Sequence, residues 1–226
     1  MTTLFIVLTA IIALATVLPL FNFTHWIVRG FDFPRFQIAV FSFVLLLAIF
    51  ICMDIQTPVT LVLISVTTLC LIWQLWWILP YTPLSSKEVK KSQEDNPDQK
   101  LNIITSNVLT PNRNAETLGK LVKQYQPDIL VTLESDSWWE QQLEVLESTM
   151  PYTVKCPLDN LYGMHLYSKL PLHDSEISYI VEEDIPSIHT SIEMKTGQKV
   201  QAHFIHPAPP SPSENTKSAE RDAELV

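Results

Sequence analysis

The stretch LFIVLTAIIALATVLPLF, residues 4–21, contains no charged side chain. A helix needs about 20 mainly apolar residues to cross the hydrocarbon core of a bilayer. Two further uncharged runs follow, at about residues 36–53 and 59–79, and Pro58 stands where a helix can begin. These three runs predict a transmembrane region over residues 1–83.

Charge is distributed unevenly along the chain. Within residues 1–83 the charged residues are Arg29, Asp32, Arg35 and Asp54, whereas nearly all other charge lies beyond Leu84. The whole chain is 47% hydrophobic and 17% charged, with a net charge of −9. An acidic chain argues against a basic surface for nucleic acid, which needs clustered Lys and Arg. The acidic charge does not exclude a nuclease whose bound metal supplies the positive charge.

Aromatic residues gather where the predicted helices meet the lipid headgroups, as aromatic belts do. They are Phe21, Phe23, Trp26, Phe31 and Phe33 in the first connection, and Trp73, Trp76, Trp77 and Tyr81 at the third exit. A cleaved signal peptide is the rival for the first run, but a positively charged start is missing and two more runs follow. A buried soluble bundle is the other rival, but the runs lack a polar stripe.

The distribution of Lys and Arg predicts the orientation. With three spans, the first connection and the polar domain share one side, and Arg29, Arg35, Lys87, Lys90 and Lys91 all fall there. The positive-inside rule then places the domain in the cytoplasm, on a multi-pass protein of the cell (inner) membrane. If one run were only re-entrant, this orientation would invert.

The polar part begins with a tether and continues as a compact domain. Residues 84–100 are rich in charge and Ser and predict a linker, and residues 101–226 predict the domain. Its first half alternates strand and helix: a strand at 101–105, a helix after the cap Asn114, a strand at 128–133, and a helix after residues 135–137.

The second half of the domain predicts strands and ends in a helix. Short runs rich in β-branched and aromatic residues lie at 152–155, 164–168, 175–181, 188–194 and 200–205. Gly197 in the sequence KTGQ predicts a hairpin turn, and a helix is expected from about Ser213. Alternating strands and helices followed by antiparallel strands predict an α/β sandwich.

Two polar side chains end neighbouring predicted strands. Asn107 follows the first strand in SNVLTPN (106–112), and Glu134 ends the second in PDILVTLE (127–134). Together at one edge of a sheet, these side chains suit Mg²⁺. Proteins usually hold this ion through one or two carboxylates and a substrate phosphate. The alternatives are a turn or cap for Asn107 and a favourable helix-start acid for Glu134.

His206 ends the last predicted strand in HFIHPAPPSP (203–212). An imidazole there can protonate a leaving oxygen or hold a phosphoryl oxygen near neutral pH, although a single histidine is more often structural. The weaker candidates are Lys169, for a phosphate, and His165, His173, His189 and His203. With four glycines in the chain and no zinc spacing, Walker loop, nucleophile elbow or dinucleotide fingerprint, those site classes are excluded.

Taken in this order, the segments resemble the endonuclease/exonuclease/phosphatase superfamily. SNVLTPN is similar to its strand-Asn motif, PDILVTLE to its metal-binding Glu motif, and YGMHLYSKLPL (162–172) to its Gly-x4-Ser-Arg-x-Pro-Leu strand pair. HFIHPAPPSP is similar to the strand with the first catalytic His, and RDAEL (221–225) to the helix after it. A membrane-anchored bacterial subgroup of the family has the same layout of tether and domain.

The resemblance implies a fold and a site. The fold is a partial four-layer α/β sandwich of the deoxyribonuclease-I type after the three transmembrane helices. Asn107 would contact the metal shell or the phosphate, Glu134 would bind Mg²⁺ or Mn²⁺, and His206 would bind the scissile phosphate or aid protonation. In the family a metal-polarised water, activated by an Asp, attacks phosphorus in line.

The chain also departs from the family pattern. Lys169 stands where the family commonly has Arg, and the later Gly-Asp-x-Asn motif and the terminal Asp-His pair have no counterpart before Val226. These departures predict a truncated member with an uncovered apolar sheet face and little or no activity. Robust Mg²⁺-dependent phosphate release, abolished by Glu134→Ala, would overturn the last point.

Two functions follow from these patterns. The first is a membrane-anchored, metal-dependent hydrolase of a phosphomonoester, phosphodiester or pyrophosphate, whose partners are the bilayer and the phosphate ester, with nucleic acid not favoured. The second is a non-catalytic membrane module that pairs with another chain through its open sheet. A third alternative is that Val226 is not the natural end of the chain.

Overall fold

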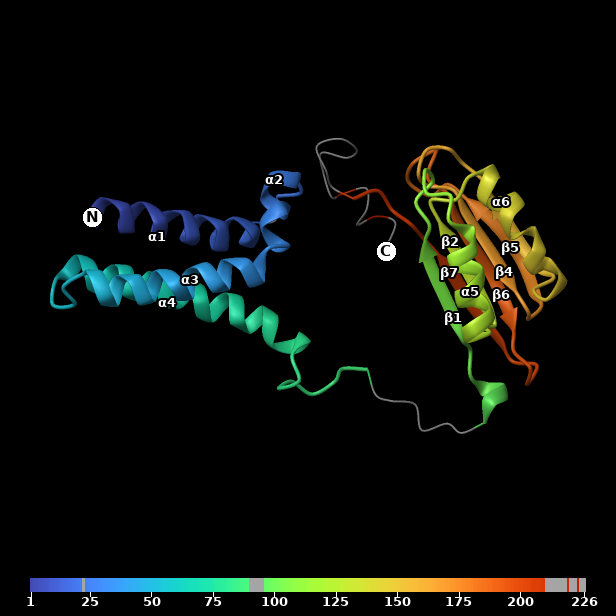
Figure 1. Cartoon of the computed structure of the whole chain (residues 1–226), viewed down its shortest axis with the longest axis horizontal. Coiled ribbons are helices and arrows are strands. Elements are labelled where there is room, and N and C mark those ends of the chain that lie inside the picture. The colour runs from blue at the N-terminus through green and yellow to red at the C-terminus, as the bar shows by residue number, and fades with distance from the viewer. Residues whose placement is uncertain (22, 90–95, 210–218, 220–222, 224–226) are drawn as a thin grey trace. The chain divides into compact units, whose positions relative to one another are not determined.

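The computed structural model describes residues 1–21, 23–89, 96–209, 219 and 223 (Figure 1). The described residues up to 89 belong to a helical unit, and residues 96–208 belong to a separate α/β unit. The helix expected from about Ser213 falls almost entirely outside the described residues. Each unit is considered by itself below.

Among the residues that the structure describes, three helices of the helical unit are long and apolar enough to cross a membrane. They are α1 (Thr2–Val17), α3 (Arg35–Cys52) and α4 (Pro58–Ile78), with the short helix α2 (Trp26–Arg29) between the first two. Thr57 caps α4 by accepting a hydrogen bond from the Thr60 amide at 3.3 Å, and Pro58 occupies the first position. Each helix overlaps one of the three runs predicted from the sequence.

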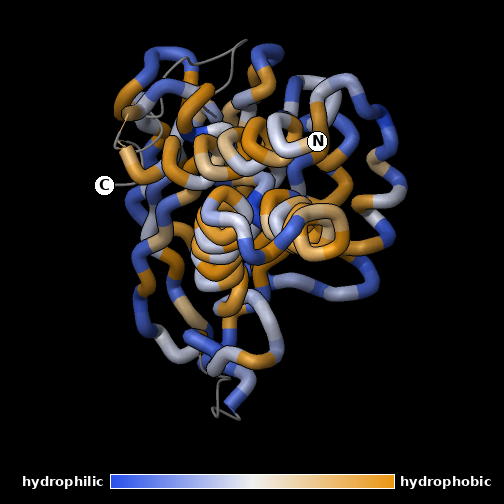
Figure 2. Tube along the Cα trace, turned by 90° about the vertical axis from the view of Figure 1, so that its left-hand side faces the viewer, coloured by the Kyte–Doolittle hydropathy of each residue, from blue (hydrophilic) through white to orange (hydrophobic). Residues whose placement is uncertain are grey.

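Apolar side chains cover these helices on the outside as well as between them. Figure 2 shows hydrophobic residues all round the helices near the N-terminus, and most of the exposed large hydrophobic side chains of the chain belong to this unit. Between α1 and α4, the Gln74 amide donates to the Thr16 hydroxyl at 3.1 Å. In an apolar environment, such a hydrogen bond determines which faces of the two helices contact each other.

The α/β unit contains two sheets. The first has the strand order β1-β2-β4-β3 and the second β5-β6-β7. Their strands are β1 (Ile103–Asn107), β2 (Ile129–Leu133), β3 (Tyr152–Cys156), β4 (Met164–Ser168), β5 (Leu172–Ser178), β6 (Ser187–Glu193) and β7 (Lys199–Phe204). Only β1 and β2 pair in parallel; the other neighbours are antiparallel.

Two helices cover one face of the first sheet (Figure 1). Helix α5 (Ala115–Tyr125) begins at Asn114, whose side chain accepts from the Thr117 amide, and ends at Gln126 in the left-handed conformation, before Pro127. Helix α6 (Ser137–Leu143) begins at Asp136, whose carboxylate accepts from the Trp139 amide. Both helix starts were predicted from capping residues.

The two sheets cover each other on their inner faces. Ile129, Val131 and Leu166 of the first sheet pack with Ile188 and Ile192 of the second, and all five are almost completely buried. The expectation of a large uncovered apolar sheet face is therefore wrong for the described residues. The reason is strand pairing: β3 and β4 join the first sheet, and β5, β6 and β7 form a second sheet that closes over it.

The open edge of this sandwich lies at β1 and β7, which are end strands of their sheets. Ile103 on β1 and Val200 on β7 remain 47% and 37% exposed. The residues that carry candidate chemistry follow β1, β2 and β7, so a functional site should be sought at the carboxyl ends of these strands.

Candidate functional site

The three side chains proposed from the sequence meet at the carboxyl ends of β1 and β2. Asn107 pairs with Leu133 across these two parallel strands, and Glu134 directly follows Leu133. Asn107 and Glu134 therefore lie next to each other where the strands end. The Asn107 amide donates to Glu134 Oε1 at 2.5 Å. His206 Nε2 lies 3.7 Å from the same oxygen.

The orientation of the Asn107 amide is set by its own loop. Asn107 Oδ1 accepts a hydrogen bond from the Leu109 backbone amide at 3.1 Å, and Leu109 has a φ of 59°. This turn occupies the side-chain oxygen. The NH₂ group therefore faces Glu134.

Glu134 is held in an unusual backbone conformation. Its φ is 59°, in the left-handed region that a side chain other than glycine adopts only at a cost of about 1–3 kcal/mol. The Thr110 hydroxyl donates to the Glu134 carbonyl oxygen at 2.7 Å, and the next residue, Ser135, donates its backbone N–H to the Gly163 carbonyl at 3.0 Å. Such strain persists where the surroundings impose it, often at functional sites.

Gly163 allows this loop to approach β4 closely. A Cβ atom on Gly163 would lie 2.0 Å from the Ser135 carbonyl oxygen and 2.6 Å from the Leu158 backbone nitrogen. Only glycine fits there, because both neighbours are backbone atoms. The position of Glu134 thus depends on a residue in a different strand connection.

The carboxylate of Glu134 is partly withdrawn from solvent. Its side chain is 15% exposed, and Oε2 is buried without a hydrogen-bond partner in the part of the chain that the structure describes. An anionic oxygen buried without a partner is costly. Because a bound cation would satisfy it, this oxygen fits the metal role predicted for Glu134.

His206 reaches Glu134 from the chain that follows β7. Its ring lies against the ring of Tyr162, with centroids 5.6 Å apart, and its side chain is 24% exposed. Tyr162 belongs to the connection between β3 and β4, so two sheets and one loop contribute to the site.

An ion pair anchors the loop after Glu134. Arg113 binds both carboxylate oxygens of Asp136, at 2.9 and 2.8 Å, and stacks over the Trp138 ring. The hydrogen bond from the Arg113 guanidinium holds the pKa of Asp136 below its usual value. Asp136 is thus ionised at neutral pH and engaged in fixing the start of α6.

The residues present fit a hard cation bound through one carboxylate. Glu134 supplies an oxygen ligand, and Asn107 and His206 stand beside it. No group of three or more His, Cys, Asp and Glu side chains suited to a metal occurs among the described residues. Mg²⁺ commonly takes its remaining ligands from water and substrate phosphate.

The other candidates from the sequence lie elsewhere. Lys169 follows Ser168, which pairs with the start of β2, so it lies at the end of the sheet opposite Glu134, and its amine donates to the Gln126 carbonyl at 3.1 Å. Lys169 therefore does not join this site. His173 is 2.6 Å from Glu193.

His189 and His203 lie together, their Nδ1 atoms 2.6 Å apart, on paired strands of the second sheet. His189 also contacts the Ser187 hydroxyl at 2.8 Å. Neither contact involves Glu134. These two histidines form a pair of their own.

His165 is fully buried in β4, and neither ring nitrogen has a hydrogen-bond partner. Burial, with a smaller effect of the Lys155 charge, lowers its pKa from 6.5 to about 4. The imidazole is therefore neutral in the folded protein at pH 7. It is a core residue and not an acid–base group of the site.

This burial predicts loss of stability in mild acid. Below pH 6.5 the unfolded chain takes up a proton at His165, whereas the folded chain stays neutral until about pH 4. Stability is full above pH 6.5, and lowering the pH to 5 should cost about 2 kcal/mol. Thermal unfolding of the wild type and His165→Phe at pH 7.5 and pH 5 measures this: equal pH dependence in both would contradict it.

Two contacts of the site were not predicted from the sequence. The Thr110 hydroxyl holds the Glu134 carbonyl, and Tyr162 supports the His206 ring. Thr110 stands three residues after Asn107, and Tyr162 stands next to Gly163. Only their place inside the quoted motifs could have indicated them.

A family model described as "Endonuclease/Exonuclease/phosphatase family" matches residues 104–226, more than half of the chain. No curated protein sequence matches the chain. Similar solved structures include TDP2 of D. rerio with a single-stranded DNA product, which is 18% identical with a TM-score of 0.47. That alignment covers 55% of this chain and 51% of the other.

An endonuclease/exonuclease/phosphatase from Beutenbergia cavernae is 13% identical, with a TM-score of 0.44 and coverages of 55% and 42%. TDP2 of C. elegans is 16% identical, with a TM-score of 0.41 and coverages of 50% and 37%. The chain thus spans about half the length of these proteins, or less. At such identities the likeness concerns the fold alone.

Proposed function

The chain belongs to the endonuclease/exonuclease/phosphatase family, and from this premise we propose that its α/β unit binds a phosphate ester and hydrolyses it with a divalent metal, Mg²⁺ or Mn²⁺. One observation carries the proposal. Three side chains from separate segments meet at one sheet edge, around a buried carboxylate oxygen of Glu134 that has no hydrogen-bond partner.

Each side chain has a task that its geometry supports. Glu134 would hold the metal, which when bound polarises a phosphoryl oxygen and an attacking water. Asn107, whose amide is oriented by the Leu109 turn, would keep the carboxylate in place and donate to a phosphate oxygen. His206 is 24% exposed and would donate a proton or hydrogen bond to the substrate.

The chain's composition narrows the proposed substrates. A phosphomonoester, a phosphodiester or a pyrophosphate fits the site, and the net charge of −9 disfavours nucleic acid. The three apolar helices support a membrane protein by their length and composition. The Lys and Arg residues near them favour a multi-pass protein of the inner membrane with the α/β unit in the cytoplasm. A phosphate ester near the bilayer is then the favoured substrate.

The alternative function, a non-catalytic module pairing through an open sheet, has lost its main support. The inner faces of the two sheets already pack on each other. The remaining exposed apolar residues at this edge, Ile103 and Val200, are few. Hydrolysis is the better proposal.

The proposal is tested with the full chain in neutral detergent. We expect release of p-nitrophenol from bis(p-nitrophenyl) phosphate or p-nitrophenyl phosphate to require Mg²⁺ and to stop with EDTA. It should fall about 100-fold or more in His206→Ala, as loss of a hydrogen-bond donor to the transition state does. His173→Ala is the matched control, because His173 contacts Glu193 and not the site.

Binding is measured on the same samples, so that the test does not depend on turnover alone. Inorganic phosphate should bind to the wild type only when Mg²⁺ is present, as titration calorimetry would show. Absence of both turnover and Mg²⁺-dependent phosphate binding would refute the proposed function. Turnover that survives in His206→Ala at the rate of the His173→Ala control would remove His206 from the mechanism.

A further inference from the structure

A cavity of about 480 Å³ lies in the helical unit, where α3 begins and α4 ends. Its lining combines aromatic rings with a carboxylate and a guanidinium. The lining residues include Asp32, Phe33, Arg35, Phe36, Trp77 and Tyr81. None of them takes part in the site of the α/β unit.

The charges at this cavity do not balance. Arg35 donates to the Asp32 carboxylate, and Arg29 Nη1 lies 3.6 Å from the same group. Two guanidiniums therefore share one carboxylate. The only other charged residue within residues 1–83 is Asp54, which follows the opposite end of α3. A net positive charge remains at the cavity.

One donor of this cluster has no acceptor. Arg29, which lies beside the cavity and not in its lining, has a buried Nε without a hydrogen-bond partner among the described residues. A buried donor without a partner carries a desolvation penalty that a bound acceptor would remove. Phosphate oxygens match the planar donor array of arginine particularly well.

The aromatic rings place these guanidiniums at the level of lipid headgroups. The Arg35 guanidinium carbon lies 4.8 Å from the centroid of the Trp77 ring. Phe33 and Tyr81 are 75% and 91% exposed at the same end of the helices. Exposed aromatic side chains at helix ends typically lie at the boundary between hydrocarbon and headgroups.

We propose that this cavity binds the headgroup phosphate of an anionic phospholipid. Arg35 in the lining is the hydrogen-bond donor, and Arg29, which contacts Asp32, adds a second positive charge beside it. A lipid fits better than free phosphate because Phe36 and Trp77 add apolar surface beside the charges. The inference rests on insertion of the three helices into a bilayer. It is independent of phosphate-ester hydrolysis, so either proposal can fail alone.

The rival explanation is a structural ion cluster in which Asp32 only neutralises the two arginines. The two explanations differ in what Asp32→Asn does. If the cluster is structural, losing the carboxylate weakens the packing of the helices and any lipid contact. If the cavity binds an anion, Asp32 competes for the guanidiniums, and its removal strengthens binding.

The test uses the full chain in neutral detergent with equal amounts of phosphatidylglycerol and phosphatidylcholine. Native mass spectrometry counts the lipids retained. We expect the wild type to prefer phosphatidylglycerol, and Arg35→Gln or Arg29→Gln to lower its retention about fivefold. Asp32→Asn should raise retention. Lys87→Gln, which removes an exposed positive charge after α4, should leave it unchanged.

Circular dichroism of each variant separates loss of the site from loss of the helices. If Arg35→Gln unfolds, Arg29→Gln and Asp32→Asn decide. Equal retention of the two lipids, a loss in Lys87→Gln as large as in Arg35→Gln, or weaker retention in Asp32→Asn would overturn the proposal. Displacement of phosphatidylglycerol by millimolar inorganic phosphate would also overturn it, since the cavity would then bind a small anion and not a lipid.

Discussion

Replacing Glu134 with glutamine should weaken Mn²⁺ binding at least about tenfold, because this carboxylate provides the negative charge that holds the cation. Glutamine keeps the shape of the side chain and one acceptor oxygen, so the hydrogen bond from Asn107 can be preserved. Electron paramagnetic resonance of free Mn²⁺ in titrations of the full chain measures the affinity directly. It requires no turnover.

Stability provides an independent readout for the same variant. Glutamine removes the charge from a buried carboxylate group whose Oε2 has no hydrogen-bond partner among the described residues. Residues kept for function often cost stability. Glu134→Gln should therefore unfold at the same temperature as the wild type or a higher one, whereas a purely structural glutamate would lose stability on substitution.

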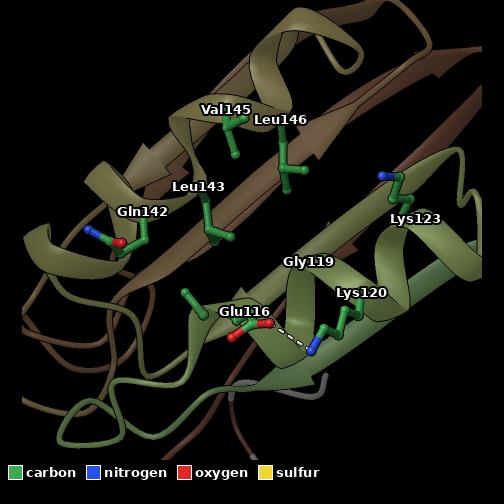
Figure 3. Close-up of a pocket in the computed structure, with 9 residues that line it drawn as sticks. Glu116, Gly119, Lys120, Lys123, Gln142, Leu143, Val145 and Leu146 are labelled. Atoms are coloured by element: carbon green, nitrogen blue, oxygen red, sulfur yellow. Dashed lines mark ion pairs between the residues drawn. The ribbon is translucent and has the colours of Figure 1, made fainter.

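Glu116→Gln is the matched control. It removes one negative charge from the exposed face of α5, where Glu116 pairs only with Lys120 at 2.7 Å (Figure 3). Its Mn²⁺ affinity should equal that of the wild type. Equal losses in Glu116→Gln and Glu134→Gln would mean that net charge and not a site attracts the cation.

Gly163→Ala should destabilise the α/β unit by about 3 kcal/mol, at the upper end of the usual cost of overpacking. The added methyl would meet the Ser135 carbonyl at 2.0 Å and the Leu158 nitrogen at 2.6 Å, and neither backbone atom can rotate away. The loop that carries Glu134 must shift. Mn²⁺ binding should weaken together with stability.

Hydrogen exchange followed by mass spectrometry tests this in the full chain. Peptides covering β2 and β4 should exchange about 100-fold faster if the unit loses about 3 kcal/mol. Gly119→Ala is the control, because Gly119 lies within α5 with open space around its Cα (Figure 3). That variant should gain roughly 0.5–1 kcal/mol. Unchanged exchange in Gly163→Ala would show that the loop yields without cost.

Much of the fold could be predicted from the sequence because local patterns encode it. The uncharged run at residues 4–21 and its two successors became α1, α3 and α4. Capping residues predicted the starts of α5 and α6, and Gly197 adopts the positive φ expected at its hairpin. The predicted fold class, three apolar helices followed by an α/β domain of the family, is confirmed.

Strand boundaries and strand partners were harder to predict from the sequence. β5 runs from Leu172 to Ser178, whereas residues 175–181 were predicted. Which strands share a sheet depends on contacts between residues far apart in the sequence, and periodicity does not record them. The expected open sheet face was wrong for this reason.

The candidate site could likewise be predicted from the sequence only in part. That Asn107 and Glu134 end adjacent parallel strands followed from the sequence alone, because the ends of parallel strands share one edge. Their metal-binding and catalytic roles, and that of His206, stay predictions. The residue types and their order in the motifs determined which side chains to test.

Only the tertiary structure decided how these side chains are held. The left-handed turn at Glu134, the contact of its loop with Gly163 and the support of His206 by Tyr162 each join segments separated by many residues. The burial of His165 and the contact between His189 and His203 could not be predicted from the sequence either. The residue type determines the chemistry of a side chain. Its partners and its exposure to water are determined only when distant segments of the chain pack together.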